Sequence, residues 1–574
     1  MDKLLKYTVR FVGLEEHAEL AELVKEISVG ARRQGDPIGS RFLLARRGGT
    51  DQKAFLDALK AKGHFDATVN VEITGEEGEV HELVFHIAPH TRYLLAPPAL
   101  IIEPAAERFT PPAWEKLKLA EGEPAESERI LKAEEILRQS ALEQGHPFAK
   151  TGKRRVRLDR ERHLAKVELR LEPGPWVELG EVRIKGNEKV EEAFLQRRIP
   201  WSAGTPYHPK RLEELRKAMT TTGLFSVARV KLADQADGSG HWPVELEVTE
   251  RKHRTWRAGA AFSTDRGMVM NGGWEHRNLG NAGERLRAEA TVGMANLSLL
   301  GSYDIPDFAR RGQRLRFSGK LDQAKEQAYE NVSMELGAGV SRPVFEPGGE
   351  VSLTLNYRLS NVVELSTDIR KSYSYASLPL GLTLDRGNDP LDATQGWRFS
   401  SELAPMLTMT GQGVTHVRWN NRGSLYHTPE GLPRLVLAGR AELDSIHGAE
   451  RDAIPADNRL YAGGGSSLRG YGQQLASPLD PTGKPLGGRS LVAFGGEARY
   501  RMNDSFGVVG FLDAGSALLA EWPWQGLHLL YGAGLGVRYM TAIGPLRLDV
   551  AAPLSRREGI DAAYQLYMSI GQAF

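Results

Sequence analysis

Hydrophobic and polar positions repeat in two different ways along this chain, and the change falls near residue 251. Before that point, amphipathic helical patterns alternate with strand patterns. Three segments share the same order of features, namely a helix end, a glycine, an aromatic residue and a strand: LKAKGHFDATVNVEI (59–73), ALEQGHPFAKTGKRRVRL (141–158) and MTTTGLFSVARVKL (219–232). Because Gly63, Gly145 and Gly223 are about 80 residues apart, the pattern predicts three tandem modules.

The third unit shows the predicted module most completely. WVELGEVRIKGN is typical of an opening strand, EEAFLQRRI of a short helix and HPKRLEELRKAMTTTG of a longer helix that ends at Gly223. Two strands follow, so we expect a β-α-α-β-β module with two helices on one face of a three-stranded sheet. The edge of such a sheet either accepts an incoming extended chain or is covered by helices or a neighbouring module, and the pattern fits both. The predicted modules span residues 5–89, 90–174 and 175–251.

From residue 255 to residue 574 the helical period disappears and apolar and polar residues alternate. A soluble sandwich would alternate too, but two features favour a membrane barrel. The alternation continues for over 300 residues without a helical segment to cover the sheet, and Tyr, Trp and Phe occur towards the strand ends. At about 10 residues per strand and a similar length per connection, the region predicts a 16-stranded antiparallel transmembrane β-barrel. The expected fold class is therefore α+β repeats followed by an all-β barrel.

Composition adds few constraints. The chain has 74 Lys+Arg and 73 Asp+Glu, so its net charge does not indicate nucleic acid or a membrane surface as partner. It has no cysteine, which excludes disulfides and thiolate metal sites. No apolar run approaches the roughly 18 residues of a membrane-spanning helix. Because MDKLLKYTVRFVG lacks the apolar segment of a secretory signal, the chain either stays in the cytoplasm or is a mature form without its native signal peptide.

No motif of catalytic chemistry is found in the sequence. GGGSSLRG does not have the spacing of a nucleophile elbow, and GAGLGVRY (532–539) lies within alternating strands rather than at a dinucleotide loop. PTGKPLGG lacks the upstream glycine and the Ser or Thr of a phosphate-binding loop. We therefore expect neither an enzyme nor a bound cofactor or metal.

One flexible segment, GGGSSLRGYG (463–472), carries a single charge beside an aromatic ring. Arg469 is either a solvated arginine on a surface loop or an anchor that pairs with a carboxylate inside the barrel. A guanidinium makes directional, bidentate contacts, so one such pair would hold a glycine-rich loop in place. Asp513 and Glu497 are the two candidate partners on the barrel wall.

Four segments of the predicted barrel resemble a known family. They are Leu468-Arg469-Gly470-Tyr471, Phe511-Leu512-Asp513-Ala514-Gly515, the strand from Ile543 to Asp549, and the terminal aromatic Phe574. With three preceding modules, the chain resembles the POTRA-plus-barrel outer-membrane insertase superfamily along nearly its whole length. The module number is similar to that of its translocation-and-assembly (TamA) group.

The resemblance implies a location, a function and partners. It implies an outer-membrane barrel with POTRA domains in the periplasm, which assists the assembly of autotransporters and other barrel proteins. The implied partners are client barrel proteins, outer-membrane lipid and a TamB-like periplasmic protein anchored in the inner membrane. It also implies that Leu468, Arg469, Gly470 and Tyr471 lie in the lumen and that Arg469 pairs with Asp513. The alternative function is a secretion pore of the two-partner type.

A seam between the first and last barrel strands is the expected point of client entry. In lipid every backbone hydrogen-bonding group must be paired, so an entering strand needs a template edge. A barrel offers one only where its first and last strands meet, and Gly571 would weaken pairing there unless it simply forms a turn at the chain end. The expected seam residues are Trp256, Ala258, Ala260, Phe262, Leu566, Met568, Ile570, Gly571 and Phe574.

Overall fold

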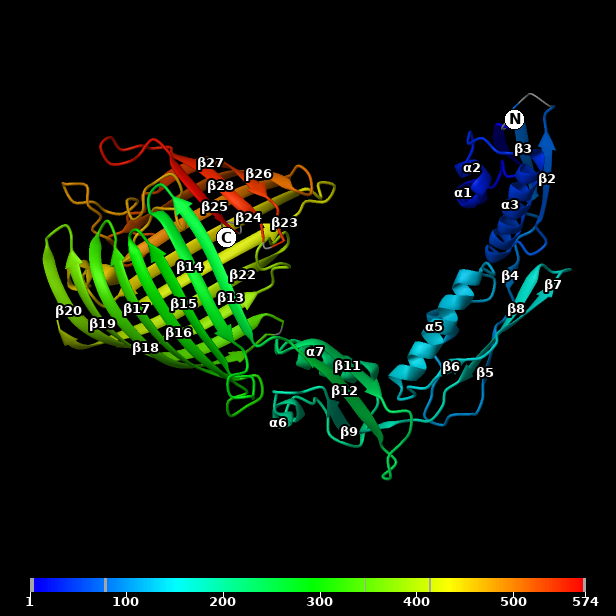
Figure 1. Ribbon diagram of the computed structural model, residues 1–574, viewed down its shortest axis with the longest axis horizontal. Helices are drawn as coiled ribbons and strands as arrows, with labels where there is room; N and C mark the ends of the chain where they lie inside the picture. The colour runs from blue at the N-terminus through cyan, green and yellow to red at the C-terminus, as the bar shows by residue number, and fades with distance from the viewer. Residues whose placement is uncertain (1–4, 77–79, 346, 412–413, 543, 571–574) are drawn as a thin grey trace. The chain divides into compact units, whose positions relative to one another are not determined.

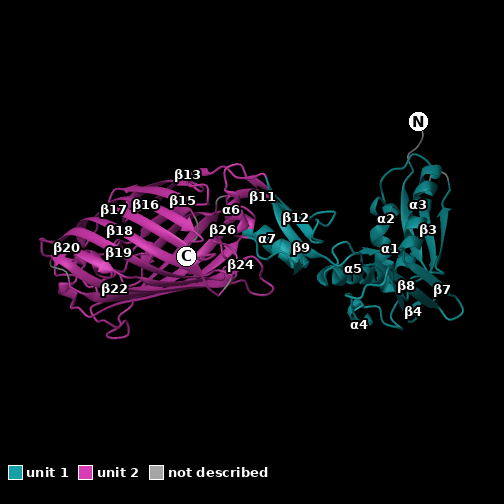
Figure 2. Ribbon diagram, turned by 90° about the horizontal axis from the view of Figure 1, so that it is seen from below, with its two compact units in different colours: residues 1–185, 199–218, 229–247 teal, residues 186–198, 219–228, 248–574 magenta. Residues whose placement is uncertain are grey.

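The computed structural model describes residues 5–76, 80–345, 347–411, 414–542 and 544–570 (Figure 1). The chain divides into two compact units (Figure 2). One holds residues 1–185, 199–218 and 229–247, and the other holds residues 186–198, 219–228 and 248–574. The first unit contains two αβ domains and most of a third, while the second contains the barrel.

The first αβ domain has a three-stranded sheet in the order β1-β3-β2, in which β1 and β3 are parallel and β2 and β3 antiparallel. Its core joins the apolar face of the sheet to α1 and α3, with Phe55, Leu59, Leu83 and Phe85 fully buried. The elements are β1 (Tyr7–Val12), α1 (Ala18–Ile27), α2 (Val29–Arg32), α3 (Arg41–Ala61), β2 (Thr68–Thr74) and β3 (His81–Ala88).

The second and third αβ domains repeat this arrangement with extra short strands. In the second, β8 is central and pairs with β4, β5, β6 and β7. Its elements are β4 (Leu94–Leu95), β5 (Ala99–Ile102), α4 (Trp114–Leu117), α5 (Ser127–Glu143), β6 (Lys150–Thr151), β7 (Arg155–Asp159) and β8 (Leu164–Glu172). The third has the order β10-β9-β12-β11. Its elements are β9 (Glu178–Lys185), α6 (Glu192–Gln196), β10 (Thr205–Pro206), α7 (Pro209–Thr220), β11 (Phe225–Leu232) and β12 (Trp242–Glu250).

The three glycines at the predicted helix ends all have a left-handed backbone. Their φ angles are +91° at Gly63, +98° at Gly145 and +72° at Gly223, and each follows a helix by two or three residues. Glycine reaches this conformation without a steric penalty, which explains why the same residue ends each of these helices. No helix in the described ranges is both long enough and apolar enough to cross a membrane.

Part of the third αβ domain belongs to the barrel unit, and the packing explains why. Phe194 on α6 is buried where the chain passes Gly283, whose Cβ would lie 2.7 Å from the Phe194 ring. Arg198 pairs with Asp307 at 2.6 Å in the turn after β16. The backbone N–H of Glu191 donates to the carbonyl of Asn281 at 2.8 Å. These contacts fix residues 186–198 to the rim of the barrel.

The barrel is closed, and each strand is antiparallel to its neighbours (Figure 1). Among the described residues it has seventeen strand segments. They are β13 (Arg254–Ser263), β14 (Gly267–His276), β15 (Arg285–Gly293), β16 (Asn296–Pro306), β17 (Arg314–Lys325), β18 (Tyr329–Pro343), β19 (Gly349–Glu364), β20 (Ile369–Ser377), β21 (Leu380–Asp385), β22 (Gly396–Gly411), β23 (His416–His427), β24 (Leu435–His447), β25 (Ser490–Arg501), β26 (Phe506–Leu518), β27 (Leu530–Tyr539), β28 (Leu546–Pro553) and β29 (Gln565–Ile570).

Two of these segments share one position, so the barrel has sixteen strands around its wall, and the predicted fold class is confirmed. β20 and β21 both pair with β19 on one side and with β22 on the other. Pro379 lies between them, and proline has no N–H to donate to a neighbouring strand. The break therefore interrupts one strand without opening the wall.

Side chains of the barrel strands alternate in the sense opposite to that of a soluble protein. On β28, Leu546, Leu548 and Val550 are 42–44% exposed, whereas Arg547 and Asp549 are buried. The apolar residues face outward and the charged residues face the lumen. This inversion is expected where the outer surface contacts hydrocarbon and the lumen is polar.

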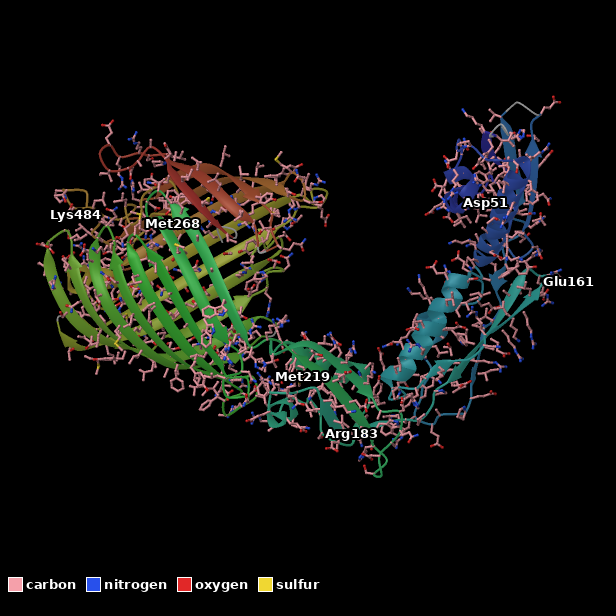
Figure 3. The ribbon with its side chains drawn as sticks, viewed as in Figure 1. Asp51, Glu161, Arg183, Met219, Met268 and Lys484 are labelled. Carbon is pink, nitrogen blue, oxygen red and sulfur yellow. The ribbon has the colours of Figure 1, made fainter. Side chains whose placement is uncertain are left out.

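A buried carboxylate organises the helices of the first αβ domain. Asp51 on α3 is fully buried and labelled in Figure 3. It accepts hydrogen bonds from the Ser28 hydroxyl at 2.7 Å, from the backbone N–H of Val29 at 2.9 Å and from that of Gly30 at 2.8 Å. Ser28 in turn caps α2. The contacts join two helices at a point where the backbone N–H groups would otherwise be buried without partners.

Replacing Asp51 with alanine should weaken this domain without affecting the barrel. Three donors would lose their acceptor inside the core, at a cost of about 3 kcal/mol in the free energy of local opening. Hydrogen exchange of the α3 amides measures that free energy. Asp57→Ala is the matched control, because Asp57 is exposed on the same helix. Equal exchange in the two variants would contradict the assignment.

Candidate functional site

The long connection between β24 and β25, residues 448–489, forms a folded loop that we call the lumen loop. It contains the short helices η1 (Arg451–Ala453) and η2 (Ala456–Asn458). Its buried residues, among them Ile454, Leu460, Leu468 and Tyr471, form one apolar cluster with wall residues such as Leu491. The loop therefore packs against the inner wall of the barrel and does not extend freely into solvent.

Arg469 lies at the tip of this loop and makes a bidentate contact with Asp513 on β26. Its Nε is 2.7 Å from one carboxylate oxygen and its Nη2 is 2.8 Å from the other. The backbone N–H of Arg469 also donates to Asp513 at 3.2 Å. Both side chains have no exposed surface. The fork of the guanidinium matches the two oxygens of the carboxylate, which fixes orientation as well as position.

The remaining Nη1 of Arg469 contacts two further carboxylates. Glu497 on β25 accepts at 2.6 Å and Asp549 on β28 at 3.3 Å. The Arg469 guanidinium also lies 3.5 Å above the centre of the Phe511 ring, which adds a cation–π contact. One arginine thus contacts the wall strands β25, β26 and β28, where the sequence left a choice between Asp513 and Glu497.

The three carboxylates of this cluster are shared with other arginines of the wall. Glu497 accepts from Arg499 at 2.7 Å, and Asp549 accepts from Arg547 at 2.7 Å. Asp549 also pairs with Arg538, and Asp513 with Arg440 at 3.5 Å. Sharing matters because a buried ion without a partner is costly, whereas a fully hydrogen-bonded cluster is tolerated.

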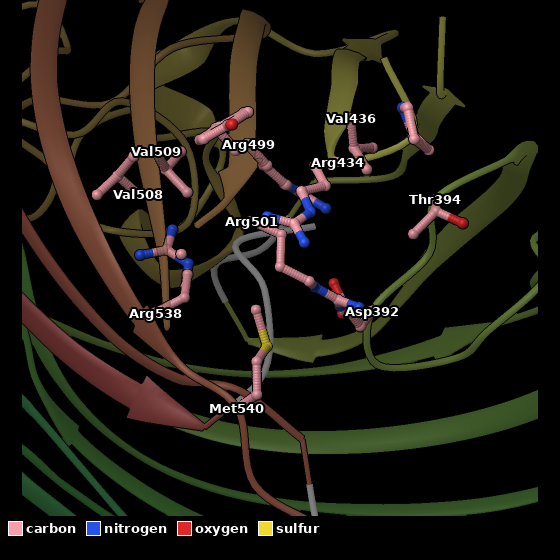
Figure 4. A pocket seen from close by; sticks show the side chains of 13 residues that line it. Asp392, Thr394, Arg434, Val436, Arg499, Arg501, Val508, Val509, Arg538 and Met540 are labelled. Atoms are coloured by element: carbon pink, nitrogen blue, oxygen red, sulfur yellow. Dashed lines mark hydrogen bonds and ion pairs between the residues drawn. The ribbon is translucent and has the colours of Figure 1, made fainter. Parts of the chain in front are cut away.

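A row of further arginines extends from the cluster towards the end of the barrel at which β13 begins. Arg499 and Arg538 line a cavity of about 60 Å³ together with Arg434, Arg501 and Asp392. Figure 4 shows these side chains converging, and Arg501 pairs with Asp392 at 2.6 Å. Glu497, Arg499 and Arg501 occupy alternate positions on β25. They form a row of charged side chains from the loop tip towards the end of the barrel at which β13 begins.

The residues next to Arg469 complete the signature. Gly470 has a φ of +96°, and a Cβ there would lie 2.8 Å from the backbone of Ala552, so only glycine fits. Leu468 and Tyr471 are fully buried. The Tyr471 hydroxyl donates to the backbone carbonyl of Tyr531 at 3.2 Å, which joins the loop to β27.

A second anchor holds the first half of the lumen loop to the wall formed by β18, β19 and β20. Asp457 on η2 accepts from Arg358 and Ser360, each at 2.9 Å, and from Tyr373. Arg459 makes a bidentate contact with Glu364 at 2.6 and 3.1 Å. β18–β20 and β25–β28 are about half the barrel circumference apart in the strand order, so the loop spans the lumen.

The seam between β13 and β29 has a short ladder. Among the described residues it pairs Phe262 with Met568 and Ser263 with Tyr567, whereas β13 and β14 pair over ten residues. The backbone N–H of Thr264 also donates to the carbonyl of Leu566 at 3.0 Å. Within the described residues, this ladder is therefore shorter than the ladders that join β13 to β14 and β28 to β29.

The expected seam residues are distributed unevenly around this ladder. Trp256, Ala258 and Ala260 pair with β14, and Leu566 and Ile570 pair with β28. Of the expected residues, only Phe262 and Met568 are partners in the ladder across the seam within the described part of the two strands, next to the pair of Ser263 and Tyr567. Gly571 and Phe574 lie outside the described residues.

Four contacts of the site were not assigned from the sequence. Asp549 was placed in a family segment without a role, and Asp457 and Arg459 lie in a loop that has no periodic pattern. Tyr567 alternates with the outward residues of β29, so it faces the lumen; that alternation was the available signal. The pairing of Asp549 requires the register between β27 and β28, which the alternation does not give.

A closed barrel with apolar side chains outside and charged ones inside, preceded by αβ modules and filled by an arginine-anchored loop, defines an outer-membrane barrel of the assembly and secretion class. The chain belongs to the Omp85 superfamily, whose domain matches residues 278–574. Residues 177–251 match a POTRA domain described as a surface antigen variable number repeat. The fold places the barrel in the outer membrane and the POTRA domains in the periplasm.

Similar proteins include outer membrane protein assembly factors named BamA. The one from Neisseria meningitidis is 21% identical over 71% of this chain and 58% of its own length. The one from Nitratidesulfovibrio vulgaris is 22% identical over 75% of this chain and 55% of its own length. The chain thus spans less than two thirds of either relative. The crystal structure of Haemophilus ducreyi BamA lacking POTRA domains 1–3 has a similar fold, with a TM-score of 0.70 at 16% identity over 83% of this chain and all of that one.

Replacing Arg469 with alanine should free the loop tip while the barrel stays folded. Breaking a buried pair costs about 3–5 kcal/mol, which corresponds to protease cleavage within residues 448–489 at least about 100-fold faster. Arg469→Lys keeps the charge but loses the fork, so its effect should be intermediate. The control is Lys484→Ala on the exposed part of the same loop (Figure 3). Wild-type resistance in folded Arg469→Ala protein would contradict the anchor.

Asp457→Asn tests the second anchor separately. The substitution keeps the shape of the side chain but removes the charge that faces Arg358, so we expect opening of residues 451–460 to become about 3 kcal/mol easier. Hydrogen exchange of that segment measures the change, while exchange near Arg469 should stay as in wild type. Asp452→Asn is the matched control, since the Asp452 side chain is 79% exposed. A uniform loosening of the whole loop would show that the two anchors are one unit.

Proposed function

We propose that this chain is an outer-membrane assembly factor that promotes insertion and secretion of autotransporters and other β-barrel proteins through the seam between β13 and β29. The observation that carries the proposal is the short ladder of that seam, two paired positions against ten between β13 and β14 among the described residues. Membership of the Omp85 superfamily supports the same activity class.

The physical basis is the demand for backbone pairing in lipid. A client strand that enters the hydrocarbon layer without partners exposes polar groups at a cost of several kcal/mol each. An open seam offers the free edges of β13 and β29, and a client strand adds to one of them as a further strand. Separating the two pairs of the seam costs far less than separating the ten of β13 and β14, both counted over the described residues, so we expect the wall to open first at the seam.

The lumen loop has a defined task in this mechanism. Arg469 holds the loop tip against β25, β26 and β28, next to the last strand. The loop therefore keeps this part of the wall in one arrangement while the seam exchanges partners. Loss of Arg469 should impair client assembly in a barrel that is still folded.

The POTRA domains supply the link to other proteins. The three αβ domains are similar in number to those of the TamA group, and we propose a TamB-like, inner-membrane-anchored protein as their partner. The action is assembly by strand addition and involves no catalysis. A secretion pore of the two-partner type is the competing function, and steady conductance in planar bilayers with a client in the lumen would identify it.

Locking the seam tests the proposal directly. Phe262 and Met568 face each other in the ladder, and the chain has no native cysteine to interfere. Phe262→Cys with Met568→Cys should form a disulfide, because directly opposed strand residues meet its distance requirement. We expect the oxidised protein to insert an autotransporter barrel into liposomes at least about tenfold more slowly, with recovery on reduction.

The matched control is a disulfide inside the wall. Met270 and Val292 are opposed in the ladder between β14 and β15, and both face outward. Met270→Cys with Val292→Cys should leave insertion unchanged under oxidation. If the protein with the locked seam inserts its client as fast as the reduced form, the seam is not the route.

A further inference from the structure

Tyr567 lies at the only ladder position of the seam, within the described residues, whose side chain also reaches the lumen loop. It pairs with Ser263 of β13. Its hydroxyl oxygen accepts a hydrogen bond from the backbone N–H of Gly470 at 3.3 Å. The side chain is 4% exposed. One residue of the last strand thus contacts the first strand through its backbone and the Arg469 signature through its side chain.

The ring of Tyr567 is packed from the loop side as well. A Cβ on Gly465 would lie 2.9 Å from the ring, so the loop passes over it at a distance that only glycine permits. The ring also belongs to a small buried cluster with Val509, Phe511 and Ala551. Phe511 is the ring beneath the Arg469 guanidinium. Tyr567 is therefore one side chain away from the anchor.

The donor of this hydrogen bond is held rigidly. Gly470 follows Arg469 directly, and Arg469 is fixed through its backbone N–H and its side chain by Asp513. Gly470 has a left-handed φ, and the backbone of Ala552 lies so close that a Cβ there would be 2.8 Å from it, so this part of the loop is tightly packed. A displacement of Arg469 must therefore move the backbone N–H of Gly470, which donates a hydrogen bond to the Tyr567 hydroxyl.

We propose that Tyr567 is a positioning residue that couples the arginine anchor to the seam. While Arg469 is seated, Gly470 holds the Tyr567 side chain and with it the part of β29 that pairs with β13. When the anchor is released, this restraint is lost and the two-position ladder of the seam opens more often. The biological purpose of this coupling rests on the proposed function. The coupling itself can be measured in the protein without a client.

The test is hydrogen exchange at two amides that report the seam. The backbone N–H of Thr264 donates to the Leu566 carbonyl, and the N–H of Leu566 donates to the Thr264 hydroxyl. Tyr567→Phe removes only the hydroxyl and keeps the ring in its cluster. Loss of one neutral hydrogen bond should accelerate exchange at both amides about fivefold. Tyr564→Phe is the matched control, because Tyr564 is 62% exposed just before the same strand.

A double-mutant comparison separates coupling from simple weakening. Arg469→Ala should accelerate exchange at the same two amides, and Tyr567→Phe combined with Arg469→Ala should exchange no faster than the faster single variant. The protease resistance of the lumen loop should stay as in wild type in Tyr567→Phe, since the contacts of Arg469 with Asp513 do not involve the hydroxyl.

Three results would overturn the assignment. They are wild-type exchange in Tyr567→Phe, independent and multiplicative effects of the two substitutions, and a loop that becomes cleavable in Tyr567→Phe. Arg469→Lys repeats the comparison should Arg469→Ala fail to fold. Because no client is present, failure of this experiment is distinct from failure of the proposed function, which is judged by client insertion in the protein with the locked seam.

Discussion

The contact on which the rest of this site depends is the buried cluster of Arg469 with Asp513, Glu497 and Asp549. A barrel of this kind directs most of its apolar side chains outward, so the apolar cluster around Leu468 and Leu491 covers only part of the contact between loop and wall. Polar groups hold the rest of the loop, and these are favourable inside only when every charge is paired. An arginine fits because one planar group reaches three carboxylates at once.

The same cluster also determines which strands of the wall are linked by side chains as well as by backbone hydrogen bonds. β25 and β26 are joined by a backbone ladder, and the Arg469 guanidinium connects both of them to β28, which lies beyond β27. Within the described residues, β13 and β29 are joined by their short ladder and by hydrogen bonds of Thr264 with Leu566 and Gln565, and no guanidinium bridges the two strands. The contacts of the Arg469 guanidinium therefore end at β28, one strand before the seam.

Much of the fold follows from periodicity, whereas the site depends on register. Alternation on β28 places Leu548 outside and Asp549 inside before any coordinates are known, and Gly63 marks a helix end because of the φ angle it adopts. Alternation predicts which side of the wall a residue faces, but not its position along the barrel axis. The meeting of Arg469 with Asp549 depends on how far each strand is shifted along its neighbour, and this is set by many weak ladder contacts together. The anchor at Asp457 has no periodic signal because it lies within a loop.

The energetics of buried ion clusters suggest what the anchor contributes. Moving a charged group out of water costs several kcal/mol per ion, and the attraction between the buried charges offsets about the same free energy. The cluster therefore adds little to the net stability of the barrel. What it provides is discrimination between loop positions, since any position that separates Arg469 from its three carboxylates leaves charges buried and unpaired. A loop held in this way has one well-defined seated state. Because Gly470 passes that state on to Tyr567 in the last strand, the charge cluster restricts the strand whose pairing closes the barrel.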